Sequence, residues 1–298
     1  MLKDYLKLHF IVFIWGLTAI LSVLIRLPAA ELLFYRTLIS ALAIAIIMYI
    51  KKNTLIVDGK TVLKLVSTGL LVGVHWFLFF WAGKISTASV SVVGLSTIAI
   101  WSSFMSPLLG FGKVRIHEVL LACTVVIGIW LICRNDFQYS IGLIMSLASA
   151  FASALFTILN AHFVKAHNPY SITFYEMLGA CLASIVFMPF YAHYFSTDGN
   201  LHLAMTFQDL LWLGILSLVC TVYAFSEAVE LTKRISPYTM NLTVNLEPVY
   251  SIILAIIVLH EQTKMNADFY IGTSVIFLSV LIYPVIKYRL KLSSESNS

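Results

Sequence analysis

The sequence predicts an all-α membrane protein with ten transmembrane helices, arranged as two inverted five-helix repeats. Three observations support this fold class: a very apolar composition, ten apolar runs of membrane-spanning length, and two pairs of similar segments in the halves of the chain. Of the 298 residues, 60% are hydrophobic and only 11% are charged, whereas a soluble domain has about 25% charged residues. The charged side chains are too few to cover the surface of a protein in water. We therefore expect lipid to surround the chain.

Ten apolar runs are each long enough for a helix that crosses the roughly 30 Å hydrocarbon core of a bilayer. The first run follows Lys3 and Lys7, as the apolar region of a signal peptide would. At about 18 residues it is long for such a region, and nine more runs follow, so we interpret it as an uncleaved first helix. The runs are 8–25, 31–50, 63–83, 87–110, 117–133, 139–161, 170–191, 209–231, 236–259 and 267–286.

Lysine and arginine are concentrated at one set of helix ends. With the N-terminus inside, 14 of the 19 fall at cytoplasmic ends, Arg36 falls within a run, and the remaining four are Arg26, Lys84, Arg134 and Lys264. Cytoplasmic loops carry an excess of Lys and Arg, so we predict a multi-pass protein of the cell inner membrane with both termini in the cytoplasm. This alternation requires an even number of helices, which supports ten.

Two pairs of segments relate the halves of the chain. Residues 34–41 in the second run resemble 174–180 in the seventh, and 84–86 before the fourth run resemble 233–236 before the ninth. Because five helices per half is an odd number, the second half is inverted relative to the first, as in many secondary transporters. The expected units are a first repeat at 1–135, a second repeat at 136–292 and a polar tail at 293–298.

Motifs of several other protein classes are missing. Residues 110–113 (Gly-Phe-Gly-Lys) lack the spacing and the Ser or Thr of a phosphate-binding loop, and the basic residues form no stripe for nucleic acid. The four cysteines form no CxxC pair, so neither a disulfide framework nor a zinc site is indicated. We expect no metal, no cofactor and no nucleic acid. The expected partners are a small-molecule substrate and the lipid bilayer, with protons as a candidate coupling ion, for a monomer or a weak homodimer.

Short motifs in both halves resemble a known family. The segments 245–248 (Asn-Leu-Glu-Pro), 259–261 (Leu-His-Glu) and 270–272 (Tyr-Ile-Gly) resemble the second-half signature of EamA-type transporters of the drug/metabolite transporter superfamily. The pairs 15–16 (Trp-Gly) and 35–36 (Tyr-Arg) are also similar to that family. The resemblance covers nearly the whole chain. It implies ten helices, a cavity lined by helices 1, 3, 4, 6, 8 and 9, and export or exchange of amino acids, metabolites or drugs.

The first half departs from the family pattern at two positions. Lys113 stands where the family often has an acidic residue after a glycine. The fourth run also lacks an early proline equivalent to Pro248 of the ninth. These departures limit what the resemblance implies for the ends of the first-half helices.

Two ionisable residues are predicted near the bilayer midplane, where a charge costs at least about 2.5–3.5 kcal/mol. His75 lies roughly 16 Å along its helix beyond Lys64, and Glu247 lies roughly 16 Å beyond Ser236, at about 1.5 Å per residue. His75 either titrates and contacts substrate or bonds to a neighbouring helix. Glu247 either couples transport to protons or stabilises the bend at Pro248.

Other residues complete the predicted substrate site. Asn241 and Asn245 are four apart and share one helix face, which suits hydrogen bonds to a polar substrate or to another helix. Trp101 and Tyr223 are included from helix position alone. The predicted substrate-binding residues are His75, Trp76, Phe79, Trp101, Tyr223, Asn241 and Asn245.

The predicted coupling or gating residues are Arg36, Glu176, Glu227 and Glu247. Arg36 and Glu176 hold equivalent places in the two halves but differ in depth by some 15 Å, so a direct pair is not expected. We assign Arg36 to an outer mouth and Glu176 to an inner mouth, with snorkelling to the interface as the alternative. Glu227 is deep enough to meet a cavity. Glu230 is expected to pair with Arg234 four residues on, and Glu261 and Lys264 to cap or pair at a helix end. Gly69 and Gly73, four residues apart, are expected to allow close helix approach.

These features favour a secondary transporter that moves a small organic metabolite across the cytoplasmic membrane by alternating access. The metabolite is expected to be amino acid-like, aromatic or amphipathic, with export as the favoured direction. A membrane-embedded enzyme is the first alternative, but residues 260–261 (His-Glu) lack the second His of a zinc protease motif. A non-transporting scaffold is the second alternative, and it would usually carry a soluble effector domain.

Overall fold

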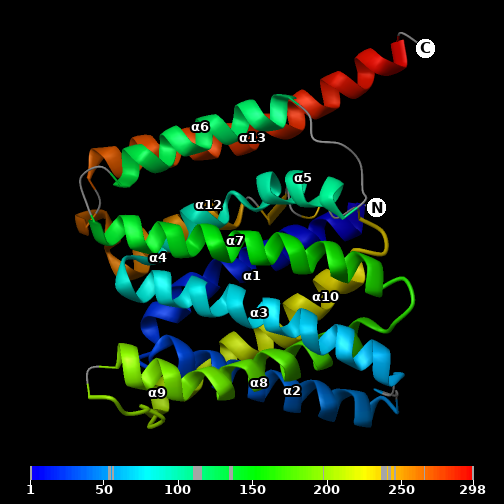
Figure 1. The fold of residues 1–298 in the computed structure, drawn as a ribbon, viewed down its shortest axis with the longest axis vertical. Helices are drawn as coiled ribbons and strands as arrows, with labels where there is room; N and C mark the ends of the chain where they lie inside the picture. Colours follow the sequence, from blue (N-terminus) through cyan, green and yellow to red (C-terminus); the bar gives the residue numbers. More distant parts are fainter. Residues whose placement is uncertain are drawn as a thin grey trace.

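The computed structural model describes residues 2–52, 55, 57–109, 116–133, 137–196, 198–235, 240, 243–244, 246–264 and 266–296. Its helices lie side by side and run roughly along one common direction (Figure 1). The elements are α1 (Leu2–Leu24), α2 (Ala29–Ile50), α3 (Gly59–Ile85), α4 (Ala88–Leu95), α5 (Ile98–Leu108), α6 (Ile116–Cys133), α7 (Phe137–Phe163), α8 (Pro169–Phe195), α9 (Phe207–Gly214), η1 (Ile215–Tyr223), α10 (Ala224–Leu231), α12 (Glu247–Leu259), η2 (Glu261–Lys264) and α13 (Ala267–Ser296).

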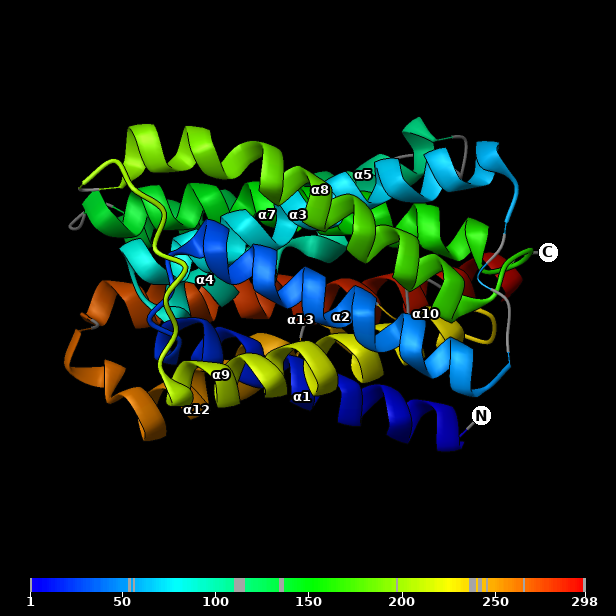
Figure 2. The same ribbon diagram turned by 90° about the horizontal axis from the view of Figure 1, so that it is seen from below.

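The helices form a layered bundle. Helices α6 and α13 pack against each other along one edge, and α2, α8 and α9 form the opposite edge (Figure 1). Between them lie α1, α3, α4, α7 and α12. Both ends of the chain lie at the same end of the bundle, opposite the segment 198–206 that precedes α9 (Figure 2).

Seven helical segments are long and apolar enough to cross a membrane, and three shorter apolar helices lie at Cys123–Ile132, Glu247–Leu259 and Ala267–Ser279. The protein is therefore a multi-pass, all-helical membrane protein over its described residues. The number ten stays a prediction, because the described apolar stretches of those three helices are shorter than a full span.

Two predicted runs are interrupted in the structure. The run 87–110 divides into α4 and α5 at Ser96 and Thr97, and in the ninth run α12 begins only at Glu247, after Leu246. Ser96 and Thr97 donate hydrogen bonds to carbonyl oxygens three residues earlier, at 2.6 and 2.7 Å, and such bonds compete with helical ones. Ser86 and Ser236 end the similar segments 84–86 and 233–236 of the two halves. Ser96 lies ten residues after Ser86, and Leu246 lies ten residues after Ser236. The two interruptions therefore occupy matching positions in the two halves.

A third departure from a regular α-helix is the π-helix η1 between α9 and α10, within the run 209–231. Side chains of two other helices bond to its carbonyl groups. The hydroxyl of Ser40 on α2 donates to the carbonyl of Ser217 at 3.2 Å, and the indole N–H of Trp15 on α1 donates to the carbonyl of Cys220 at 3.2 Å. Segments of π-helix occur frequently at functional sites.

Glycines allow α3 and α8 to touch backbone to backbone. A Cβ atom at Gly69 would lie 2.9 Å from Cα of Glu176, and one at Gly73 would lie 3.3 Å from Cα of Ala180. On α8, a Cβ at Gly179 would meet the carbonyl group of Val66. The close approach expected of Gly69 and Gly73 is therefore confirmed.

Acidic side chains cap helices at the end of the bundle opposite the termini. The buried carboxylate of Glu261 accepts bonds from the backbone N–H groups of Ala88 and Ser89, at 2.8 and 3.1 Å. It thereby caps α4, which confirms the capping role predicted for Glu261. Asp209 forms a capping box with Thr206 at the start of α9.

Alanine at Gly69 or at Gly179 is expected to destabilise the protein by about 1–3 kcal/mol, because the new methyl group would force the backbones of α3 and α8 apart. Gly214 on α9 is the matched control, since a Cβ there meets nothing within 4 Å. Gly214→Ala should leave stability unchanged or slightly higher. Thermal unfolding in detergent measures all three. Equal midpoints for the three variants would contradict the close packing.

Candidate functional site

A cavity lies inside the bundle, among α1, α2, α3, α7, α10 and the interrupted helices of both halves. Its volume is about 90 Å³, measured as the space open to the centres of water molecules. A single water needs about 10–15 Å³ by that measure. The cavity therefore has room for several waters or for part of a small solute.

Both helix interruptions border this cavity. Leu95 and Ile98 line it on either side of the break between α4 and α5, and Val244 and Glu247 line it around the start of α12. Interrupted helices that surround a central site are typical of secondary transporters.

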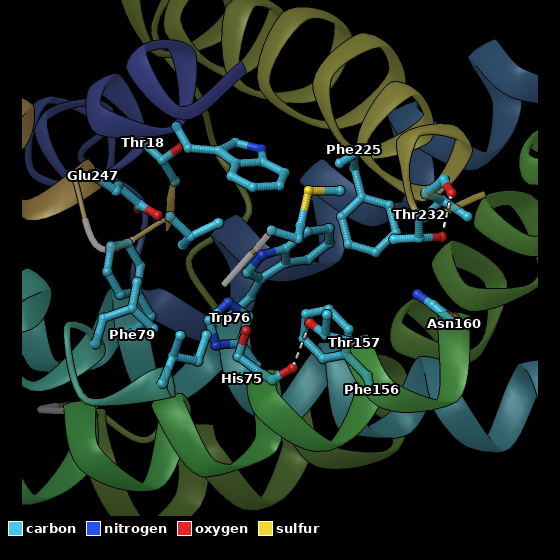
Figure 3. A pocket seen from close by; sticks show the side chains of 18 of the residues that line it. Thr18, His75, Trp76, Phe79, Phe156, Thr157, Asn160, Phe225, Thr232 and Glu247 are labelled. Carbon is cyan, nitrogen blue, oxygen red and sulfur yellow. Dashed lines mark hydrogen bonds between the residues drawn. The ribbon is translucent and has the colours of Figure 1, made fainter. Parts of the chain in front are cut away.

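Aromatic rings make up much of the wall. Figure 3 shows Trp76, Phe156 and Phe225 around the space, with His75 beside them and Phe79 on the side of Glu247. The ring centroids of Trp76 and Phe225 are 5.8 Å apart, and those of Phe156 and Phe225 are 5.9 Å apart. These spacings are those of interacting aromatic pairs. The wall offers flat apolar surfaces to a solute.

His75 contributes one ring nitrogen to a contact between helices. Its Nδ1 lies 3.0 Å from the carbonyl oxygen and 2.7 Å from the hydroxyl of Ser149 on α7, and that hydroxyl donates to the carbonyl of His75 at 2.8 Å. Within the described chain, Nε2 has no hydrogen-bond partner. His75 thus has a structural bond through one nitrogen, and the other remains available to a water or a solute.

Arg36 lies in the wall of the cavity, whereas we expected it at an outer mouth. Its side chain is 1% exposed, and its Nε donates to the hydroxyl of Thr221 in the π-helix at 2.8 Å. The guanidinium carbon lies 3.7 Å from the ring centroid of Trp76 and 5.2 Å from that of Phe80. A long side chain reaches far from its own Cα, so depth along the helix did not predict this position.

Glu247 brings a carboxylate to the same cavity. It is 5% exposed and lies in the first turn of α12, where the helix dipole favours a negative charge. Arg36 lines the same cavity. The site therefore combines an aromatic wall with one acidic and one basic group.

Glu176 lies behind the cavity wall. Asn160, which lines the cavity from α7, donates from Nδ2 to Oε2 of Glu176 at 3.2 Å. Oε1 of Glu176 and Oδ1 of Asn160 are buried, and neither has a partner among the described residues. Our sequence analysis missed Asn160, although an amide within the apolar run 139–161 was a usable signal.

Glu227 lies away from the cavity, at the end of the bundle that holds both termini. It forms an ion pair with Lys7 and accepts a hydrogen bond from the hydroxyl of Tyr170 at 3.3 Å. Nζ of Lys51 lies 5.1 Å from the ring centroid of Tyr170. These contacts join α1 and the end of α2 to α8 and α10.

The expected bond between Glu230 and Arg234 is present, at 3.3 Å. Glu230 also pairs with Lys233 at 2.8 Å. Arg234 contacts Asp4 on α1 at 3.0 Å as well.

Two other predicted substrate residues, Trp101 and Tyr223, are not among the described residues that line the cavity. Trp101 packs edge-on against Phe151, with centroids 5.4 Å apart, and Tyr223 is 38% exposed. Asn241 and Asn245 lie outside the described residues. Trp15 and Phe225 line the cavity without having been predicted in it. Trp15 entered the sequence analysis only through the family resemblance, and Phe225 is one aromatic among many.

Comparisons with known proteins place the chain in a family. A solved structure described only as the crystal structure of a protein has a TM-score of 0.67 and 14% sequence identity, and the match covers 95% of this chain and 98% of that one. This likeness shows a shared fold. No curated protein matches. The model of the EamA-like transporter family matches residues 5–134 and again residues 140–283. The chain therefore belongs to the EamA-like transporter family, with two copies of the family domain.

Proposed function

We propose that the protein carries a small organic solute across the cell inner membrane, and that the solute passes through the central cavity by alternating access. One observation carries the proposal: side chains from both family domains enclose a single cavity at the interruptions of their helices. A carrier needs such a site between two units that can move relative to each other.

The wall of the cavity favours an amphipathic solute, amino acid-like or aromatic. Phe79, Phe156 and Phe225 offer apolar surface, while Arg36 and Glu247 offer charge. Asn241 and Asn245 stay in the proposed site, whereas Trp101 and Tyr223 are not carried forward. Export remains the favoured direction, with a monomer or a weak homodimer as the working form.

The orientation is also a proposal. Fourteen Lys and Arg residues accumulate at one set of predicted helix ends, and both chain ends lie together at one end of the bundle (Figure 2). The excess of basic residues on cytoplasmic sides supports cytoplasmic termini.

The contacts around Glu227 form the proposed inner gate, defined here as Lys7, Lys51, Tyr170 and Glu227. Lys7 and Lys51 belong to the first family domain, and Tyr170 and Glu227 belong to the second. Bonds across the two domains at one end of the bundle favour a state that is closed at that end. An inward-facing state would have to break them.

A flux assay in proteoliposomes tests the proposed transport. We expect uptake of pooled labelled amino acids and related metabolites, and we expect a pH gradient to change it if Glu247 or His75 couples protons. Glu247→Gln or His75→Ala should then remove the response to the gradient. Lys233→Gln, a change at an exposed local pair, is the control.

Each outcome of that assay assigns a role. Flux that ignores the gradient in every variant would return His75 and Glu247 to structural roles in a facilitator or exchanger. Absence of flux for every solute would count against transport. Recovered solute that had been chemically altered would favour a membrane enzyme. Among the described residues, no group of three His, Cys, Asp or Glu side chains could hold a catalytic metal.

Weakening the inner gate should open the cytoplasmic end more often. In a background without native cysteines, Thr157→Cys would place a thiol in the cavity wall. We expect Lys7→Gln to increase the rate at which a thiol reagent labels this position from the cytoplasmic side by about two- to fivefold. The reason is that a partly exposed ion pair, here that of Lys7 with Glu227, contributes about 0.2–1 kcal/mol to the closed state.

Lys233→Gln again serves as the control, because the pair of Lys233 with Glu230 lies within one segment of the chain. Equal labelling rates in the Lys7 and Lys233 variants would show that the contacts around Glu227 do not gate the cavity.

A further inference from the structure

Arg36 has more N–H donors than hydrogen bonds to the described residues. A guanidinium has five N–H donors and no acceptor. The single hydrogen bond of Arg36 within the described part of the chain joins Nε to Thr221, and its buried Nη1 has no partner there. Buried charges in proteins are normally paired and hydrogen-bonded. Among the described residues, Arg36 therefore lacks an acceptor for Nη1.

Neither Glu247 nor Glu176 provides that acceptor. Glu247 lines the same cavity as Arg36, but no hydrogen bond joins the two side chains in the described structure. Glu176 has its described bond with Asn160. The open space next to Arg36 is the cavity itself, so a molecule in the cavity can supply the acceptor.

The guanidinium is held in one orientation. The ring of Trp76 lies against the guanidinium, with 3.7 Å between Cζ and the ring centroid, and the hydroxyl of Thr221 in the π-helix accepts the hydrogen bond of Nε. A planar, fixed guanidinium can bind a carboxylate through two parallel hydrogen bonds. A preorganised group also loses less entropy when a ligand binds.

We propose that Arg36 is the specificity-determining anchor of the cavity, which binds the carboxylate of the solute while the apolar body of the solute lies on the aromatic wall. The inference rests on the proposed function, because it names the chemical class of the solute that the cavity takes. Arg36 is thereby a binding residue at the centre of the molecule, in place of the mouth residue expected from its depth.

Matched acids and amides test the anchor by binding, without any need for transport. Two pairs differ only in the anionic group: 3-phenylpropionate with 3-phenylpropanamide, and L-phenylalanine with L-phenylalaninamide. Binding to the purified full-length protein in nanodiscs is measured by calorimetry and by the rise in unfolding temperature. The wild type should bind at least one acid more tightly than its amide. Arg36→Gln should weaken that acid by about 10- to 100-fold, the effect of a charge-assisted hydrogen bond, and leave the amide unchanged.

Three further variants separate anchoring from folding. Arg26→Gln removes an exposed arginine by the same substitution and should leave acid binding unchanged. Thr221→Val removes the acceptor of Nε and should weaken the acid a few-fold, and it tests the anchor even if Arg36→Gln fails to fold. Glu247→Gln removes from the cavity an acidic group that would repel the carboxylate of the solute, so it should keep or strengthen acid binding.

The outcomes for the anchor and for transport are distinguishable. Three binding results would overturn the anchor, whatever the flux assay shows. The wild type could bind acid and amide equally, or it could bind neither acid. Acid binding could also survive in both Arg36→Gln and Thr221→Val. Acid binding that depends on Arg36 without any flux would support the anchor and count against the proposed transport. Flux of both amides at the rate of the acids would support transport and reject the anchor.

Discussion

Hydrocarbon offers no partner to a backbone N–H or C=O group, so each one within the bilayer must be satisfied by the protein. Regular helices meet this requirement by themselves, and the rest of the structure depends on how the irregular segments meet it. At the break between α4 and α5, the hydroxyls of Ser96 and Thr97 bond to nearby carbonyl groups. In the π-helix, Ser40 and Trp15 reach across from other helices to two of its carbonyl groups.

These irregular segments cluster around the cavity. Both domain interruptions border it, and the π-helix holds Arg36 in its wall through Thr221. An interruption exposes polar groups that lipid would not tolerate but that a polar solute can use. The same features that make these helices costly in a membrane therefore make the cavity suitable for binding.

Much of the fold was predictable from the sequence because it depends on local composition. Apolar runs predicted the membrane helices, and the spacing of Gly69 and Gly73 predicted a close helix contact. Glu230 and Arg234 are four residues apart, in the last turn of α10 and in the turn that follows it, so their pair could be predicted from local geometry. Glu261 was expected to cap a helix end, although its partner helix α4 was not foreseen.

The parts that sequence could not predict depend on contacts between distant segments. The π-helix is bonded by side chains that lie about two hundred residues away along the chain, with separations of 177 residues to Ser40 and 205 to Trp15. The run 87–110 has no charged residue and contains several other Ser and Thr residues, so Ser96 and Thr97 did not distinguish a break from a continuous helix. Arg36 was misplaced because rise per residue locates a Cα atom and not the end of a long side chain.

The glycine contact between α3 and α8 also bears on which parts of the molecule can move. These helices belong to different family domains. Their backbones meet directly at Gly69 and Gly179, while aromatic rings such as those of Phe77 and Tyr191 pack farther along the same contact. The two glycines have no side chain that could repack, so this part of the contact has little freedom to change its shape. In the proposed alternating access, the glycine contact would act as the fulcrum about which the two domains rotate, so that the cavity opens toward one face at a time.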